Sequence, residues 1–290
     1  MRRGLKGNRV MLVHVDGLAI EGADTARSYL EALGSGSAEP FTASLFRRAV
    51  RPGTVVVDIG AFLGQYTLLA AREAGPTGRV YAFEPDPRNF AYLIKNIERN
   101  EFADRASAIP QAISDRSGEI TLYLDPDVGS GSSLVFRRRR NVTSTTVQTV
   151  TLDEFLGEAI PPDLIKLDIE GGECRALDGM TETIRRAGDR LTMIVECFPK
   201  ALRASGASTD ALIRRLERFG FRVYVIDEGR RRLFPITARR SSIWSFYLYL
   251  GLHSLLVVNL LAVRTPDHPL VASLSHEPLR LRNPDPDPPL

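Results

Sequence analysis

The chain has 290 residues, of which 43% are hydrophobic and 25% are charged, with a net charge of +3. A chain of this length and hydrophobic content can bury a large core, and the charged fraction is ordinary for a globular protein. Arginines cluster at 137–140, 230–232 and 239–240, but no aromatic residues are interleaved with them, which argues against single-stranded nucleic acid as a partner.

The two cysteines, Cys174 and Cys197, show neither metal-ligand nor disulfide spacing, which favours a reducing compartment. The first residues are not followed by an apolar stretch of signal-peptide type, so we expect a cytoplasmic protein. The arginine clusters leave open an acidic substrate or peripheral contact with the inner face of a membrane.

The N-terminal part predicts a small cap over residues 1–45. Residues 10–20 predict a hairpin that turns at Asp16, and residues 24–33 and 41–50 predict two helices. We expect this cap to lead into the first strand of the main domain.

Residues 55–64, Val-Val-Val-Asp-Ile-Gly-Ala-Phe-Leu-Gly, form an apolar run that ends in an acid and two glycines. This pattern predicts a buried strand that runs into a tight turn. Gly60 lets the backbone turn without a Cβ, Gly64 lets the next helix pack closely, and Asp58 brings a carboxylate to the ligand. The stretch therefore indicates a nucleotide-like ligand.

A second predicted strand, residues 79–83, also ends in an acid, Glu84. Such an acid can accept hydrogen bonds from both hydroxyls of a ribose. The glycine-rich loop that binds the pyrophosphate of NAD is missing, and Asp58 stands where its first glycine would be. A carboxylate repels a pyrophosphate but tolerates the ammonium and sulfonium charges of S-adenosylmethionine.

The middle of the chain predicts a helix from Pro87 to about Asn100 and a third strand near 106–113. Residues 119–150 then form an insertion before the fourth strand, with a strand-like stretch at 120–124. We expect this insertion to lie on the substrate side.

The fourth strand is predicted at 164–169. Alternation along it places Ile165, Leu167 and Ile169 on one face and Lys166, Asp168 and Glu170 on the other. Unpaired burial of three charges would cost several kcal/mol each, so they must pair, bind a ligand or reach a cleft. The further elements expected are a helix from 173, a strand at 191–196, a helix at 210–219 and a strand at 221–226.

Four ordered motifs resemble those of FkbM-type methyltransferases, an S-adenosylmethionine-dependent family of class I. They are Asp58-Ile-Gly-Ala-Phe-Leu-Gly-Gln-Tyr-Thr-Leu68, Ala82-Phe-Glu-Pro-Asp-Pro87, Thr151-Leu-Asp-Glu-Phe155 and Ile165-Lys-Leu-Asp-Ile-Glu-Gly-Gly-Glu173. The resemblance covers roughly residues 40–265. It implies an α/β, Rossmann-like domain over 46–265, with a seven-stranded, mostly parallel sheet and helices on both faces. Phe62 departs from the family, which often has a small polar residue there.

The activity that the resemblance implies is O-methylation of a hydroxyl on a sugar, a glycan or glycolipid, or a polyketide-like natural product. Cofactor-binding residues are then expected at Asp58, Gly60, Ala61, Gly64, Tyr66, Thr67, Glu84, Pro85, Gln111 and Ala112.

On the acceptor side, Asp168 is expected to orient the acceptor hydroxyl or to accept its proton, with Lys166 tuning it and Glu170 supporting the loop. Two alternatives stay open here. Asp168 and Glu196 could hold a magnesium ion, or Lys166 could form an ion pair that only orders the edge of the sheet.

Residues 243–263 contain no Asp, Glu, Lys or Arg and are long enough to span a bilayer. Polar residues within them lower the hydrophobicity, and the class I fold needs a seventh, antiparallel strand, which we assign to 256–263. Trp244 and Tyr247 could line an acceptor pocket. The proline-rich residues 266–290 are expected to be an extended, poorly ordered tail.

Other classes of protein remain open. A module that binds the cofactor without catalysis would keep the same motifs, an NAD-dependent oxidoreductase would need the missing glycine loop, and an RNA methyltransferase is disfavoured by the Asp168-Ile-Glu-Gly motif after the fourth strand.

Overall fold

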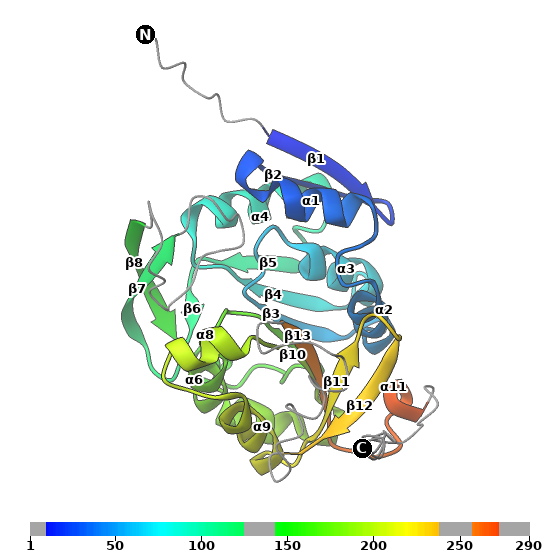
Figure 1. The fold of residues 1–290 in the computed structure, drawn as a ribbon. Coiled ribbons are helices and arrows are strands. Elements are labelled where there is room, and N and C mark those ends of the chain that lie inside the picture. The colour runs from blue at the N-terminus through cyan, green and yellow to red at the C-terminus, as the bar shows by residue number, and fades with distance from the viewer. Residues whose placement is uncertain (1–9, 125–142, 238–256, 273–290) are drawn as a thin grey trace, which may run out of the picture.

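The computed structural model describes residues 10–124, 143–237 and 257–272, arranged around one central sheet (Figure 1). The strands of this main sheet are, from one edge to the other, β12 (Arg232–Ile236), β11 (Arg222–Asp227), β13 (Val258–Val263), β10 (Thr192–Cys197), β9 (Leu164–Leu167), β3 (Val55–Ile59), β4 (Arg79–Phe83) and β5 (Ala106–Ile109). The strands from β10 to β5 pair in parallel, as the apolar runs of their sequences predict.

The predicted seventh strand is confirmed, because β13 lies between β10 and β11 and is antiparallel to both. Within the described ranges the sheet has eight strands, one more than predicted. The additional strand β12 forms an antiparallel hairpin with β11. It contains Pro235, which cannot donate a hydrogen bond to a neighbouring strand and is therefore tolerated at this edge of the sheet.

Helices cover both faces of the sheet, as expected. On one face the core includes residues of α1 (Arg27–Gly34), α2 (Pro40–Ala49), α3 (Gln65–Ala74), α4 (Pro87–Arg99) and α11 (Pro269–Ala272). On the other face it includes residues of α5 (Leu152–Leu156), α6 (Glu173–Asp178), α7 (Thr181–Ala187), α8 (Pro199–Ala204) and α9 (Thr209–Arg218). Two short 3-10 helices, η1 (Asp24–Ala26) and η2 (Gly188–Arg190), precede α1 and follow α7.

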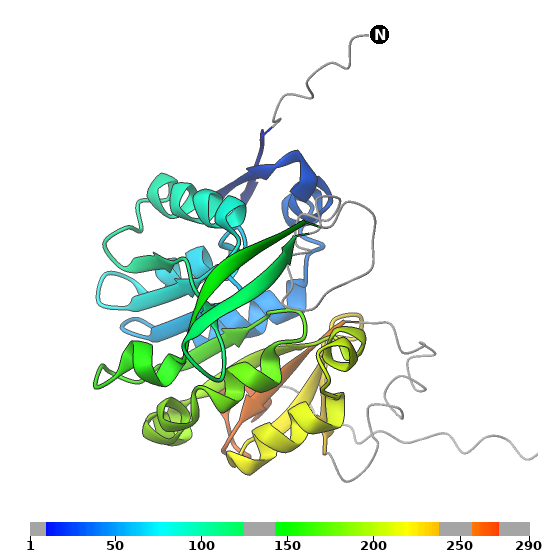
Figure 2. The same cartoon turned by 90° about the vertical axis from the view of Figure 1, so that its left-hand side faces the viewer.

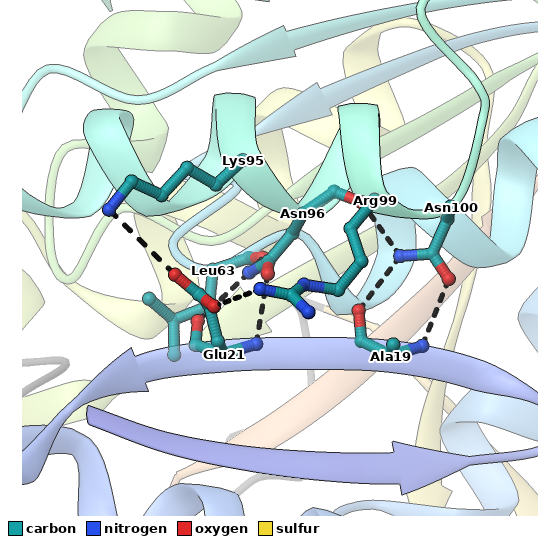
Figure 3. A network of polar contacts seen from close by, with 7 residues as sticks. All are labelled: Ala19, Glu21, Leu63, Lys95, Asn96, Arg99 and Asn100. Atoms are coloured by element: carbon teal, nitrogen blue, oxygen red, sulfur yellow. Dashed lines mark hydrogen bonds and ion pairs between the residues drawn. The ribbon is translucent and has the colours of Figure 1, made fainter.

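The predicted N-terminal hairpin is formed by β1 (Val10–Val15) and β2 (Leu18–Ala23) and lies beside α1 and α4 (Figure 1). Two asparagines of α4 bind the backbone of β2 (Figure 3). Asn96 accepts from the Glu21 N–H at 2.9 Å and donates to the Glu21 carbonyl at 2.9 Å. Asn100 makes the same pair of contacts with Ala19. These side chains supply hydrogen-bond partners for the backbone groups on the edge of β2 that does not pair with β1, and these groups would otherwise be unpaired.

The third predicted strand is divided in two. β5 ends at Ile109, and after Pro110 the chain enters a separate three-stranded sheet through β6 (Ala112–Ile113). This second sheet pairs β6 and β7 (Gly118–Leu124) with β8 (Thr143–Val150), and the β7–β8 pair faces the viewer in Figure 2. It corresponds to the insertion predicted before the fourth strand. The arginine cluster at 137–140 lies outside the described residues.

Two further predictions need correction. The fourth strand ends at Leu167, so Asp168 and Glu170 lie in the loop that follows it. Within the segment predicted as an extended tail, residues 269–272 form α11, whose Leu270 is buried against the core. Among the helices that the structure describes, none is long and apolar enough to cross a membrane. Trp244 and Tyr247 lie outside the described residues.

Candidate functional site

A cavity of about 430 Å³ opens where the parallel strands β3, β4 and β9 end. This is the edge at which open α/β sheets bind their ligands. Most of the residues predicted from the sequence line it: Asp58, Gly60, Ala61, Tyr66, Glu84, Pro85, Gln111, Ala112, Lys166, Asp168, Glu170 and Glu196.

The end of β3, just before the loop, brings Asp58, a residue of the strand itself, into the wall of this cavity. Asp58 is 2% exposed, and the hydroxyl of Thr67 donates to its Oδ2 at 2.6 Å. Burial raises the pKa of Asp58 to about 6, against the opposing effect of the Thr67 hydrogen bond. Gly60 follows with φ of 86°, and its N–H donates to the Phe83 carbonyl at the end of β4 at 2.9 Å. The two strand ends are thereby fixed to each other.

Glu84 lies directly after β4, and its carboxylate is held by backbone amides. Its Oε2 accepts from the Phe62 N–H and its Oε1 from the Asp86 N–H, each at 2.8 Å. Burial raises the pKa of Glu84 to about 7, although these hydrogen bonds favour the ionised form. The carboxylate therefore has a fixed orientation at the edge of the cavity.

Phe62, the residue that departs from the family pattern, has a left-handed backbone with φ of 52°. Few bulky residues adopt this conformation, which costs of order 1–3 kcal/mol. Its ring packs edge-on against Tyr29 of α1, with ring centroids 5.0 Å apart. Both rings line the cavity, so the N-terminal cap forms part of its wall.

Two predicted cofactor-binding residues, Gly64 and Thr67, do not line the cavity. Gly64 has φ of 96°, and a Cβ there would lie 2.9 Å from Leu93 Cδ1 of α4. The missing side chain at Gly64 therefore lets α4 pack closely against the start of α3. Thr67 acts through the hydrogen bond with Asp58 instead of facing the cavity.

Lys166 is completely buried at the cavity and forms an ion pair with Asp168, with Nζ 2.8 Å from Oδ2. Burial disfavours its ammonium form, but the charges of Asp168, Glu39 and Glu196 outweigh this effect and raise the pKa of Lys166. The lysine also lies over the ring of Tyr66, 5.2 Å from its centroid. The ion pair considered from the sequence is therefore present, and it lies inside the cavity wall.

Glu39 is a cavity residue that the sequence analysis missed. It precedes α2 with a left-handed φ of 45°. Its Oε2 accepts from the Tyr66 hydroxyl at 2.9 Å and its Oε1 from Asn259 Nδ2 at 2.7 Å. Burial raises its pKa, while the charge of Lys166 lowers it. No local motif marks this acid, because its partners come from α3, β9 and β13.

The loop after β9 is supported by Glu173 at the start of α6. Glu173 is fully buried, and its Oε1 accepts from the Gly171 N–H at 2.9 Å. Glu170 lies in this loop with φ of 49° and lines the cavity, whereas Glu173 does not. Burial raises the pKa of Glu173 to about 7.

No group of three or more His, Cys, Asp or Glu side chains is placed to hold a metal ion within the ranges that the structure describes. The ammonium of Lys166 is ion-paired with Asp168, and the charge of Glu196 also acts on it, so a fixed cation already balances charge at this position. The magnesium site considered from the sequence therefore has no support in this geometry.

The main sheet has an antiparallel β13 between β10 and β11, and the acids Asp58 and Glu84 lie at the ends of β3 and β4. This is the arrangement expected of class I S-adenosylmethionine-dependent methyltransferases. A family model described as "Methyltransferase FkbM domain" matches residues 58–223. The chain belongs to this FkbM methyltransferase family.

Among the relatives, the chain is 30% identical over 135 residues to the hexuronic acid methyltransferase AglP of Haloferax volcanii. The aligned region covers 45% of this chain and 52% of that protein. It is 42% identical over 84 residues to the 31-O-demethyl-FK506 methyltransferase FkbM of Streptomyces tacrolimicus, covering 28% and 31%. The chain thus spans about half or less of the length of these relatives. A solved O-methyltransferase from Thermotoga maritima superimposes with a TM-score of 0.44 at 12% identity, covering 88% of this chain and 77% of that one.

Proposed function

We propose that this protein transfers the methyl group of S-adenosylmethionine to a hydroxyl of a sugar, a glycan or glycolipid, or a polyketide-like natural product. Membership of the FkbM family supports methyl transfer. The names of the two relatives, which mention a hexuronic acid and 31-O-demethyl-FK506, support a small-molecule or glycan acceptor. The observation that carries the proposal is a pair of carboxylates, Asp58 and Glu84, at the tips of neighbouring parallel strands in one cavity.

The residues at this edge fit the cofactor. Glu84 is held by two amides but keeps lone pairs for the ribose hydroxyls, and Gly60 lets the loop beside it pack directly on the backbone of Asp168. Asp58 supplies negative charge near the cationic part of the cofactor. When bound, S-adenosylmethionine supplies an electrophilic methyl group. The fit extends over Ala61, Tyr66, Pro85, Gln111 and Ala112, which line the same cavity.

The acceptor would lie beside Lys166 and Asp168. Lys166 holds Asp168 in one orientation through the 2.8 Å ion pair, and Asp168 can then accept a hydrogen bond from the acceptor hydroxyl. Such a contact aligns the oxygen for in-line attack, and orientation supplies a large part of the rate in this kind of reaction. Glu170 would support the loop that carries Asp168.

The test is incubation of the purified protein with methyl-labelled S-adenosylmethionine and a panel of hydroxyl acceptors. The panel should contain a neutral hexoside, a hexuronoside, a lipid-linked sugar and a polyketide alcohol, with binding of S-adenosylmethionine and NAD measured separately by calorimetry. We expect S-adenosylmethionine binding and labelling of one acceptor class. Binding of NAD in place of S-adenosylmethionine would contradict the proposal.

Three further outcomes separate the alternatives. Cofactor binding without labelling of any acceptor would favour a non-catalytic binding module. Loss of labelling with a chelator, and its return with magnesium, would restore a metal role for Asp168 and Glu196. Preference for the lipid-linked sugar in vesicles would support peripheral membrane contact.

A further inference from the structure

Polar side chains form a staggered row across four neighbouring strands of the main sheet, in which Glu196 lies two residues beyond the register partner of Lys166: Asp58 on β3, Lys166 on β9, Glu196 on β10 and Asn259 on β13. The strand register pairs Asp58 with Lys166 and Glu196 with Asn259. The residues next to them in sequence, among them Leu167, Val195 and Leu260, are buried in the core on the other face. The row therefore lies on the face that bears the cavity.

Two oxygens in this row lack a hydrogen bond. Glu196 Oε2 and Asn259 Oδ1 are shielded from solvent and have no partner within the described residues. Their residues are directly opposite each other on antiparallel strands, which brings Cβ atoms to about 4.5–5.5 Å in general. Two acceptor oxygens cannot bond to each other, but one proton on Glu196 would let its carboxyl group donate to Asn259 Oδ1 and satisfy both.

The orientation of the Asn259 amide supports this arrangement. Its Nδ2 donates to Glu39 Oε1 at 2.7 Å, and Glu39 is in turn held by the Tyr66 hydroxyl at 2.9 Å. Because the amide nitrogen donates to Glu39, the oxygen Oδ1 is the atom of Asn259 that remains for Glu196. An acceptor oxygen beside Glu196 favours the protonated form of its carboxyl group, which can donate a hydrogen bond.

Asp168 is less suited to this task. Its Oδ2 already accepts a hydrogen bond from the ammonium of Lys166 at 2.8 Å, and this contact holds the carboxylate in the ion pair. Burial and the nearby charge of Asp168 raise the pKa of Glu196 well above its usual range, against the effect of Lys166. A base is most effective when its pKa is closer to the working pH. The two carboxylates therefore differ in environment, as acid and base pairs at enzyme sites often do.

We propose that the Glu196 carboxylate accepts the proton that the acceptor hydroxyl loses during methyl transfer, while Asp168 orients that hydroxyl. The inference rests on the proposed function and assigns a proton acceptor to the same site. In the step, a lone pair of the hydroxyl oxygen forms the new O–C bond, and the pair of the S–C bond returns to sulfur. The O–H pair stays on oxygen, and the proton passes to Glu196, whose carboxyl group can then donate to Asn259.

A first experiment needs no acceptor. Infrared titration of the full chain should reveal the carbonyl stretch of a protonated carboxyl group that is absent from Glu196→Gln and unchanged in Glu182→Gln, a control at an exposed ion pair on α7. In Asn259→Leu this group should titrate at lower pH, because the protonated form loses its hydrogen-bond partner. The inference would be overturned if the spectrum of Glu196→Gln were identical to that of the wild type, or if the carboxyl group titrated at higher pH in Asn259→Leu.

The second experiment compares pH profiles of kcat with the acceptor labelled best in the panel. The wild-type rate should rise with pH as Glu196 ionises. Glu196→Gln should lower kcat by about 100- to 10,000-fold and abolish this rise, whereas Asp168→Asn should lower kcat but retain it. An unchanged rise in Glu196→Gln would overturn the inference alone. Failure of the wild-type protein to bind S-adenosylmethionine would instead overturn the proposed function and the inference with it.

Discussion

Gly60 and Asp168 approach so closely that a Cβ on Gly60 would lie 1.8 Å from the Asp168 carbonyl oxygen. Gly60 lies in the loop after β3, and Asp168 in the loop after β9. The Asp168 N–H also donates to the Ile59 carbonyl at 2.9 Å. The loop proposed to cradle the cofactor and the loop proposed to orient the acceptor are therefore packed backbone to backbone.

Replacement of Gly60 by alanine should separate these two loops. The clash involves backbone, which cannot turn aside as a flexible side chain can, and φ is 86°, so we expect a loss of at least about 1–3 kcal/mol in the free energy of unfolding. Gly75→Ala is the matched control, since it has a positive φ of 65° but no atom within 4 Å of the added Cβ. Urea unfolding of both variants tests this, and equal losses would contradict it.

Removal of the Glu84 carboxylate should weaken S-adenosylmethionine binding by about 1.5–3 kcal/mol, because charged acceptors make the stronger hydrogen bonds. Calorimetry on Glu84→Ala measures this effect. Glu84 also accepts from Phe62 and Asp86, so a thermal melt without ligand should accompany the titration to separate lost contacts from a disordered loop. Unchanged affinity would refute the assignment.

Cofactor affinity should rise as the pH increases through about 7, the raised pKa of Glu84, which is caused by burial. The ribose hydroxyls favour the ionised carboxylate, so binding should release a proton below that pH. The folding stability of the free protein depends on pH in the opposite direction, because it falls as the pH rises. The folded state holds this proton more tightly than the unfolded state, whose pKa is near 4.5, so the stability contributed by protonated Glu84 is lost between about 4.5 and 7. Calorimetry in buffers of different ionisation enthalpy counts the protons, and a Glu173→Gln control should leave that number unchanged.

Asp168→Asn should leave the fold and S-adenosylmethionine affinity nearly intact while kcat falls by at least about tenfold, because orientation acts mainly in the transition state. Asp178→Asn on α6, which breaks an ion pair with Arg215 away from the cavity, serves as the control and should retain activity. The measurement is methyl transfer to the best acceptor. Equal rates for Asp168→Asn and wild type would exclude this role.

Asn96→Leu should destabilise the attachment of the N-terminal hairpin. Asn96 is fully buried, and its amide serves the N–H and carbonyl of Glu21 and the carbonyl of Leu63 (Figure 3). Each orphaned group costs about 1–3 kcal/mol, so a loss of several kcal/mol in the free energy of unfolding is expected. Hydrogen exchange at β2 would localise the effect, and protection equal to wild type would show that the hairpin is held by its apolar contacts instead.

Local patterns in the sequence predicted much of the fold. Buried strands were predicted for β3, for β4 and for residues 256–263, because each contains a run of apolar residues. Such side chains are stable only when they are removed from water, so the runs specify buried strands. The same patterns placed Asp58, Glu84 and Lys166 at one edge of the sheet. These are properties of single segments, and the sequence carries them directly.

Only the tertiary structure decided how distant segments meet in the site. Glu39 carries no motif, and it becomes a cavity residue because Tyr66 and Asn259, far from it in the chain, donate to its carboxylate. The different environments of Asp168 and Glu196 likewise depend on which of them pairs with Lys166. Hydrogen bonding and desolvation act between neighbours in space, so the sequence supplied the carboxylates and the packing of the strands decided their roles.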